Sequence, residues 1–249
     1  MTVDAVLCID VGNSRLKWGL CNLSTLNFKQ QGVLDLNQVS VDDLTGCFGD
    51  MEACPVWCSS VAGAGVLHLL TDWFAKHWSV AINSAQGALA EYHRLNAYKT
   101  ASELGLDRWL AMIAIDNITD ESFCIIDAGT AITIDVVIAG LHKGGVIMPG
   151  IQLMLKALQA NTENIGSALG SYVSLADNTA DAVESGVIDN IVGGIERALS
   201  RIQTICPDII VMITGGDAER IAQLSDMNLI IESNAVMKGL GVVARNAYA

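Results

Sequence analysis

The chain has 249 residues and a formal net charge of −13, with 51% hydrophobic and only 16% charged residues. This composition is typical of a globular protein with a large core and excludes disorder, which requires low hydrophobicity and high charge. The acidic balance argues against general attraction to nucleic acid. No membrane span is expected, because the longest apolar stretch, residues 123–139, is interrupted by two aspartates, a glycine and two threonines.

The cysteines and the N-terminal residues indicate in which cellular compartment the protein is expected. Seven cysteines are an odd number, and no second Cys/His pair at metal spacing accompanies Cys54 and Cys58. Buried thiols in a reducing environment are therefore favoured over disulfides or a zinc site. The first four residues, Met1 to Asp4, lack the basic and apolar segments of a secretory signal. We expect a cytoplasmic protein.

The first half of the chain predicts a strand meander followed by alternating helices and strands. Apolar runs predict strands at residues 4–10, 15–21 and 28–34, a helix near 40–48, a buried strand at 55–60 and a helix near 63–77. A strongly apolar helix is expected at residues 103–118.

The second half repeats this order. Strands are expected at residues 122–127, 131–138 and 143–148, helices near 150–161 and 179–204, a strand at 209–214, a helix from 217, a short strand at 228–231 and a closing helix. The repetition predicts an α/β fold with two similar halves, residues 1–118 and 119–249, and a cleft between them.

A short near-repeat supports the two halves. Residues 8–14, Cys-Ile-Asp-Val-Gly-Asn-Ser, are echoed by residues 125–131, Ile-Ile-Asp-Ala-Gly-Thr-Ala, so that Asp10 and Asp127 are 117 positions apart. Each copy is an apolar strand that runs into an Asp-x-Gly turn and is followed by a second strand-like run. Two short matches can arise by chance, so the order of elements carries equal weight.

The first turn has the groups that a nucleotide phosphate needs. The Asp10 carboxylate can hold Mg²⁺ directly or through water, because hard cations prefer oxygen ligands. Gly12 permits close approach of the backbone, Asn13 and Ser14 offer hydrogen-bond donors, and Lys17 follows. The alternative is a hairpin in which Asp10 and Asn13 only stabilise the turn.

Two further turns extend this pattern. Asp127 to Thr130 repeats the arrangement, with Thr130 as a second phosphate donor, and Asp135 is expected to face the cleft or solvent. Residues 214–217, Thr-Gly-Gly-Asp, lie between a strand and a helix, where α/β sheets place nucleotides. Asp217 there is compatible with a ligand and with a helix N-cap. Neither a Walker sequence nor a Gly-x-Gly-x-x-Gly turn is present.

Asp107 and Arg108 are the best candidates for work on an acceptor substrate. They open the apolar run 109–115, and an acid–base pair at the start of a buried helix is costly unless it is used. Asp107 can deprotonate an alcohol, and Arg108 can bind a carboxylate through two parallel hydrogen bonds. The alternative is a salt bridge at a helix N-terminus. The four histidines, at 68, 77, 93 and 142, show no metal or triad pattern and are expected to be ordinary surface or interface residues.

Taken together, these segments resemble the type III pantothenate kinases, a family in the superfamily of acetate and sugar kinases, heat-shock chaperones and actin. The resemblance runs nearly end to end and is carried by seven motifs in order: residues 10–17, 96–98, 104–109, 127–131, 144–150, 178–182 and 214–217. It implies two ribonuclease-H-like halves and transfer of the γ-phosphoryl group of ATP to the 4′-hydroxyl of pantothenate, the first step of coenzyme A synthesis.

The resemblance also implies roles for individual residues. Asp107 would be the catalytic base, Asp10 would hold Mg²⁺, and Asp127 would bind the monovalent cation, K⁺ or NH₄⁺, that the family requires. The implied ATP contacts are Asp10, Val11, Gly12, Asn13, Ser14, Arg15, Leu16, Lys17, Thr130, Gly215 and Gly216. The implied pantothenate contacts are Tyr98, Gly105, Leu106, Asp107 and Arg108, together with Thr179 from the neighbouring subunit of a homodimer.

Two other functions are compatible with parts of this pattern. A kinase for another small hydroxy acid or sugar would share the phosphate turns, although Arg108 suits a carboxylate better than a neutral sugar. A nucleotide-binding accessory factor for transcription, without turnover, would share the fold. The intact Asp107–Arg108 pair argues against an inactive enzyme, and the acidic balance argues against direct binding of DNA.

Overall fold

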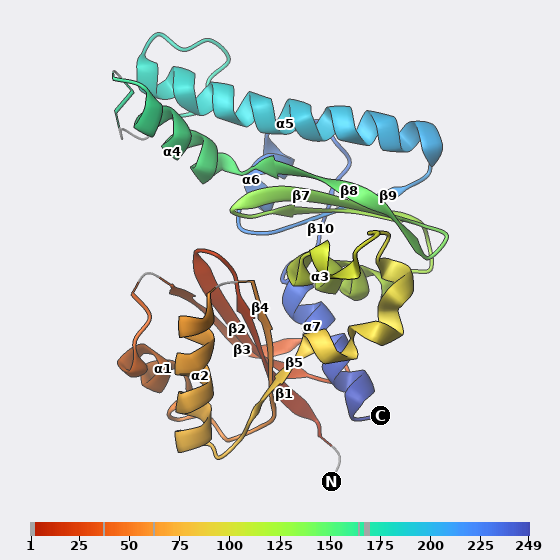
Figure 1. Ribbon diagram of the computed structural model, residues 1–249. Helices are drawn as coiled ribbons and strands as arrows, with labels where there is room; N and C mark the ends of the chain where they lie inside the picture. Colours follow the sequence, from red (N-terminus) through yellow and green to blue (C-terminus); the bar gives the residue numbers. More distant parts are fainter. Residues whose placement is uncertain (1–2, 37, 62, 164, 167–169) are drawn as a thin grey trace. The chain divides into compact units, whose positions relative to one another are not determined.

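The computed structural model describes residues 3–36, 38–61, 63–163, 165–166 and 170–249 (Figure 1). The chain forms two compact units. The first comprises Met1–Asp120, Gly140–His142 and Asn234–Ala249, and the second comprises Glu121–Ala139 and Lys143–Ser233. Among the described residues, no helix is both long enough and apolar enough to cross a membrane.

The first unit is built on a five-stranded sheet with the order β3-β2-β1-β4-β5. Strands β1 and β2, and β2 and β3, are antiparallel, whereas β1, β4 and β5 are parallel. The strands are β1 (Ala5–Val11), β2 (Arg15–Asn22), β3 (Phe28–Asp35), β4 (Val56–Ser60) and β5 (Ile82–Ser84). The central strand β1 is apolar apart from Asp10 because both of its faces are covered, whereas the edge strand β3 is mostly exposed.

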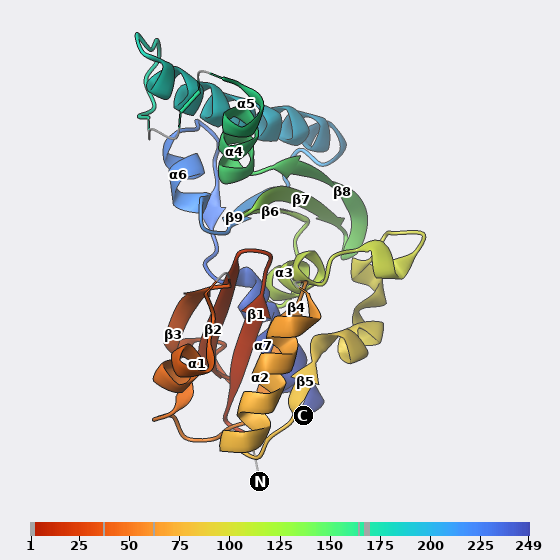
Figure 2. The same ribbon diagram turned by 60° about the vertical axis from the view of Figure 1, so that its left-hand side comes forward.

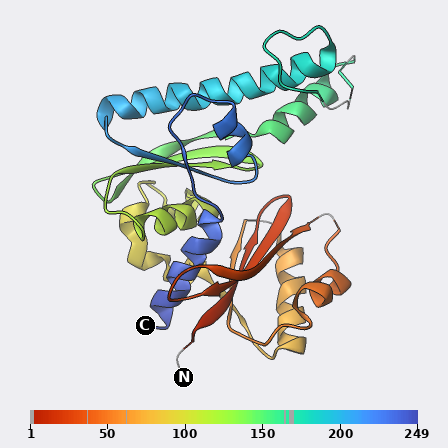
Figure 3. The ribbon, with the colours of Figure 1, turned by 180° about the vertical axis from the view of Figure 1, so that it is seen from behind.

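Two layers of helices cover this sheet, and Figures 2 and 3 show them from two sides. On one face, α1 (Val41–Phe48) and α2 (Ala64–His77) pack an aromatic cluster in which Phe48 lies 5.2 Å from Trp18 and 5.3 Å from Phe74, centroid to centroid. Helix α1 begins with a capping box between Ser40 and Asp43.

The opposite face is covered by the C-terminal helix α7 (Ala235–Ala247), which packs on α3 (Leu106–Asp116). The two helices approach so closely that a Cβ added to Gly239 would lie 1.9 Å from the carbonyl oxygen of Leu110. Two 3₁₀ segments, η1 (Ala85–Leu95) and η2 (Ala101–Glu103), lead into α3.

The second unit repeats the topology of the first. Its sheet has the order β10-β9-β6-β7-β8. If these strands are renumbered one to five along the chain and the order is read from the other end, it becomes 3-2-1-4-5, the order of the first sheet. Strands β6 and β7 are antiparallel, and β6, β9 and β10 are parallel. The strands are β6 (Phe123–Ala128), β7 (Ala131–Ile138), β8 (Leu141–Pro149), β9 (Ile210–Thr214) and β10 (Ile230–Ile231).

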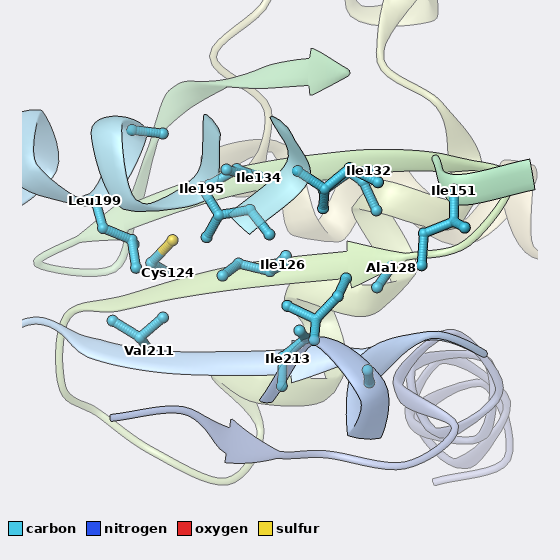
Figure 4. Packing of buried hydrophobic residues seen from close by; sticks show 14 of the residues in the cluster. Cys124, Ile126, Ala128, Ile132, Ile134, Ile151, Ile195, Leu199, Val211 and Ile213 are labelled. Carbon is cyan, nitrogen blue, oxygen red and sulfur yellow. The ribbon is translucent and has the colours of Figure 1, made fainter. Parts of the chain in front are cut away.

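The core of the second unit lies between this sheet and its helices, α4 (Ile151–Asn161), α5 (Thr179–Ile205) and α6 (Ala218–Gln223). Alternate residues of β6 and β7 point toward α5, where Ile126, Ile134 and Ile195 are fully buried (Figure 4). Strand alternation therefore leaves Asp127 on the opposite face of the sheet.

The repeated topology confirms the predicted α/β fold with two similar halves, and most predicted elements are present. Three features differ. The apolar helix is shorter than residues 103–118 because Gly105 sits at its N-cap and the preceding residues form 3₁₀ turns. Strand β5 and η1 were not predicted. The closing helix belongs to the first unit, so a single boundary at residue 118 does not describe the division.

The close packing of α7 on α3, which places the C-terminal helix in the first unit, can be tested by mutation. Gly239→Ala should destabilise the protein by roughly 3 kcal/mol, because the added methyl group meets a helix backbone that cannot move away cheaply. Gly46→Ala in α1, where a Cβ would meet nothing within 4 Å, is the matched control and should be neutral or stabilising. Urea unfolding measures both; equal effects of the two changes would contradict the packing described.

Candidate active site

The first glycine turn joins β1 to β2 at the end of the sheet. The N–H of Gly12 donates to the carbonyl oxygen of Arg15 across the turn at 3.0 Å, so Asn13 and Ser14 form an exposed two-residue tip. Asp10 lies just before the turn, is only 7% exposed, and is paired in register with Lys17 on β2. The predicted carboxylate and its neighbouring donors are therefore brought to one edge of the sheet.

Two residues of this turn offer only their backbone to a ligand. The side chains of Val11 and Leu16 are fully buried in the aromatic core on the α1–α2 face. Asp10 and Lys17 project from the other face, because neighbouring residues of a strand alternate. Any contact of Val11 or Leu16 with ATP would therefore be made by backbone N–H or C=O groups.

Ser59 and Ser60 at the end of β4 were missed by the sequence reasoning. Ser59 is paired in register with Asp10 and Ser60 with Val11. Ser59 is fully buried, and within the described part of the chain neither hydroxyl has a hydrogen-bond partner. The only signal was two polar residues closing an apolar strand beside the first turn.

Asp10 also affects the pKa of Cys58, which precedes Ser59 on β4. Burial, and after it the Asp10 carboxylate, raise the pKa of the Cys58 thiol to about 12. A thiol with this pKa stays protonated near neutral pH unless a bound metal displaces the proton. All seven cysteines are free thiols in the structure, four of them buried and three partly buried.

The second glycine turn and the start of α4 are in contact within the second unit. The N–H of Gly150 donates to the carbonyl oxygen of Thr130 at 3.1 Å. A Cβ at Gly150 would lie 2.4 Å from the carbonyl oxygen of Gly129, so only glycine fits there. Thr130 is exposed at the tip, in the position that corresponds to Asn13 in the first turn.

The third glycine turn meets the second. Gly215 has a φ of +101°, and a Cβ there would lie 2.4 Å from the carbonyl oxygen of Ala128 and 2.6 Å from Oδ1 of Asp127. The N–H of Asp217 donates to the same Ala128 carbonyl oxygen at 3.0 Å. The structure thus places Asp127, Thr130 and Gly215 in one cluster, although their sequence positions span 89 residues (215 − 127 + 1).

The prediction for Asp135 was wrong. This residue was expected to face the cleft or solvent, but its side chain is 1% exposed within β7. Burial, and after it the Asp135 carboxylate, raise the pKa of Cys124 to about 12. Asp135 is therefore a buried acid of the sheet.

Asp107 lies in the first turn of α3, where the backbone is arranged around its carboxylate. Oδ1 of Asp107 accepts the N–H of Arg108 at 2.8 Å. A Cβ on Gly105, the N-cap residue, would lie 2.6 Å from that Oδ1, so glycine leaves the space that the carboxylate occupies. Asp107 is partly exposed and can be reached by a substrate, as a proton acceptor must be.

Arg108 is 5% exposed and is held by Tyr98. Nη1 of Arg108 donates to the Tyr98 hydroxyl at 2.8 Å, and the guanidinium carbon lies 5.5 Å from the centre of the Tyr98 ring. Both residues were predicted as one substrate-binding group, and the structure brings them together.

The expectation that His142 is an ordinary surface or interface residue was wrong. It is 5% exposed, and its ring lies nearly parallel to that of Tyr98, with 6.3 Å between centroids and 11° between planes. Its Nδ1 accepts the N–H of Ala97 at 3.1 Å. The sequence carried no sign of this, because residues 97 and 142 meet only in the folded chain.

Thr179 is not in the unit that contains Tyr98, Asp107 and Arg108. It is the exposed first residue of α5, in the second unit. Asn178 caps the helix by accepting the N–H of Asp181 at 3.0 Å, so the cap alternative is correct for that residue. The pKa of Asp181 is lowered because its carboxylate accepts the Ser171 N–H and a hydrogen bond from Asn178. Thr179 also lines a groove of about 820 Å³ between α4 and α5, with Met154 and Leu158 among its apolar residues.

Comparison with known proteins identifies the family. A family model described as type III pantothenate kinase matches residues 6–201. A type III pantothenate kinase of Dechloromonas aromatica is 33% identical over 94% of this chain and 97% of its own length, and one of Nitrosococcus oceani is 31% identical over 97% and 94%. This chain belongs to the type III pantothenate kinase family.

Solved structures show the same fold. A Baf family protein from Campylobacter jejuni aligns with a TM-score of 0.64 and 21% identity, over 97% of this chain and 98% of that one. A protein from Sinorhizobium meliloti described as a 2-dehydro-3-deoxygalactonokinase aligns with a TM-score of 0.59 and 10% identity, over 97% and 99%. At these identities the two structures support the architecture of this type III pantothenate kinase family member and nothing about its substrate.

The carboxylates of this family member are dispersed. Among the described residues, no group of three or more His, Cys, Asp or Glu side chains is arranged to hold a metal ion. Asp10 and Asp127 each lie one residue before the end of a central strand, next to a glycine turn.

Proposed function

We propose that this protein transfers the γ-phosphoryl group of ATP to the 4′-hydroxyl of pantothenate, giving 4′-phosphopantothenate in the first step of coenzyme A biosynthesis. The observation that carries the proposal is the start of α3. There a buried guanidinium, Arg108, and a reachable carboxylate, Asp107, occupy adjacent positions. Pantothenate has a carboxylate and an acceptor 4′-hydroxyl, so its site needs a cation for the carboxylate and a proton acceptor for that hydroxyl.

Arg108 is proposed to bind the substrate carboxylate. Its contact with Tyr98 fixes the guanidinium before substrate arrives, so little side-chain entropy is lost on binding. A lysine at this position would lack the planar pair of donors that matches a carboxylate. Tyr98, Gly105 and Leu106 complete the proposed pantothenate contacts in this unit, because they surround the same helix start.

Asp107 is proposed to accept the proton of the attacking hydroxyl. Phosphoryl transfer depends mostly on positioning and electrostatics, so the base mainly orients the nucleophile. The Arg108 N–H fixes one carboxylate oxygen of Asp107, and the absence of a side chain at Gly105 keeps the approach open.

The glycine turns are proposed to bind ATP. In the first turn the side chains of Asn13, Ser14, Arg15 and Lys17, with the backbone of Val11, Gly12 and Leu16, are the proposed phosphate contacts. Asp10 is proposed to hold Mg²⁺, which would neutralise charge on the phosphates, and the buried Ser59 hydroxyl beside it suits an oxygen-rich site. Thr130, Gly215 and Gly216 are the proposed contacts in the second unit.

Asp127 is proposed to bind a monovalent cation, K⁺ or NH₄⁺. Its carboxylate lies beside Gly215 and at the base of the turn that presents Thr130. A chain with a net charge of −13 repels an incoming anion over long distances, and local cations offset this repulsion.

A second copy of the chain is proposed to supply Thr179 to the pantothenate site. Thr179 is exposed on the rim of the α4–α5 groove, whose apolar lining suits burial against another subunit. The proposed partners are thus ATP, pantothenate and a second protomer, without nucleic acid or membrane. The expected cytoplasmic location stays a prediction.

The proposal is tested first by turnover. Purified protein with ATP, Mg²⁺ and pantothenate should release ADP and 4′-phosphopantothenate in equal amounts, and replacing K⁺ or NH₄⁺ by Na⁺ should lower the rate. Mass spectrometry of the product and a coupled ADP assay measure both. ADP release without phosphopantothenate would contradict the substrate, and equal rates in all three cations would contradict the role of Asp127.

Asp107→Asn tests the base. The amide cannot accept the proton, so kcat should fall by about 10²- to 10⁴-fold while the KM for pantothenate changes only a few-fold. Glu103→Gln, an exposed carboxylate four residues earlier, is the matched control and should keep the parent kcat. If Asp107→Asn turns over within a few-fold of the parent, Asp107 is not the base.

A further inference from the structure

We infer that His142 is a positioning residue for pantothenate, acting through Tyr98 on Arg108. The inference rests on the proposed function and adds to it a residue that contacts no reacting atom. It starts from a structural fact: His142 belongs with the first unit, although the rest of β8 after it belongs to the second.

The His142 ring is fixed on one edge and one face. Its Nδ1 accepts the Ala97 N–H at 3.1 Å, so that nitrogen carries no proton. Its face lies against the Tyr98 ring at an interplanar angle of 11°. Since Ala97 and Tyr98 are adjacent, one histidine side chain sets both the backbone and the ring of this segment.

The same segment is fixed from within. The N–H of Tyr98 donates to Oδ1 of Asn96 at 3.0 Å, and Nδ2 of Asn96 donates to the carbonyl oxygen of Ala101 at 2.9 Å. These bonds shape the loop 96–101 but do not fix the Tyr98 ring. The Tyr98 ring instead stacks on the His142 ring, and its hydroxyl accepts a hydrogen bond from the Arg108 guanidinium.

The backbone that presents His142 is itself anchored to α3. Ala139 and Gly140 form the β7–β8 turn with φ of +50° and +71°. Nη1 of Arg94 donates at 2.8 Å to the Gly140 carbonyl oxygen and also at 2.8 Å to Oδ1 of Asp116, at the end of α3. The turn two residues before His142 is therefore tied to the helix that carries Arg108.

These contacts form one connected path from Asp116 through Arg94, the turn and His142 to Tyr98 and Arg108. Removing the Nδ1 acceptor releases the Ala97 N–H and loosens the backbone that carries Tyr98, even where a flat ring still stacks on the Tyr98 side chain. The Arg108 guanidinium then has more orientations to lose on binding a carboxylate. The affinity for pantothenate should therefore fall, whereas ATP binding and the chemical step do not depend on these contacts.

The test compares two substitutions of His142. His142→Phe keeps a flat ring for stacking but cannot accept the Ala97 N–H. In His142→Asn, the asparagine Oδ1 lies near the position of the histidine Nδ1 and can accept that N–H. His142→Phe should raise the KM for pantothenate about tenfold, the effect of about one hydrogen bond, with kcat and the KM for ATP within about twofold. His142→Asn should restore the KM for pantothenate to within about threefold of the parent. His93→Phe, at an exposed histidine, is the control.

A readout that needs no turnover separates this inference from the proposed function. Ala97 is exposed, so protection of its amide from hydrogen exchange reports the bond to His142. His142→Phe should lose that protection and His142→Asn should keep it, even if pantothenate proves not to be the substrate. The inference is overturned if a folded His142→Phe protein keeps the parent KM for pantothenate. It is also overturned if kcat and both KM values change by one common factor, or if protection at Ala97 is unaffected.

Discussion

The contact between Arg108 and Tyr98 is the interaction on which the acceptor site depends. A guanidinium that is 5% exposed costs several kcal/mol to desolvate unless hydrogen bonds and charge compensate for it. The Tyr98 hydroxyl and ring meet that need on one side, in a loop shaped by Asn96 and in stacking contact with His142. An apolar residue of similar volume often serves stability as well as a buried cation does, which fits the proposed role of Arg108 in substrate binding.

The second organising feature is a duplicated sheet whose ends are shaped by close backbone contacts. In each unit an aspartate stands one residue before the end of the central strand, on the face opposite the apolar cluster that contains the neighbouring strand residues. In the second unit, three segments converge because glycine removes the side chain at Gly150 and Gly215. The same topology therefore presents different groups: Lys17 and Ser59 are in register with Asp10, whereas Thr133 and Thr214 are in register with Asp127.

Local sequence signals predicted much of this. The ends of β1 and β6, the glycine turns and the place of Asp107 and Arg108 before an apolar helix follow from apolar runs that meet glycine or charged residues, and these are short-range effects. Contacts between distant segments were not predictable in this way. The contacts of His142 and Ser59 and the packing of α7 on α3 depend on which strands and helices become neighbours. Strand β5 has only three residues, Ile82 to Ser84, which is too short for a detectable pattern.

The central claim is that Arg108 is buried in order to bind the carboxylate of pantothenate. It is tested most directly by comparing kcat/KM for pantothenate with that for the analogue in which –CH₂OH replaces the carboxylate. The claim predicts a preference of at least about 100-fold for pantothenate in the parent protein, because the alcohol offers the guanidinium no charged acceptor. In Arg108→Gln that preference should shrink to less than about tenfold. Equal use of the two substrates by the parent protein would contradict the claim.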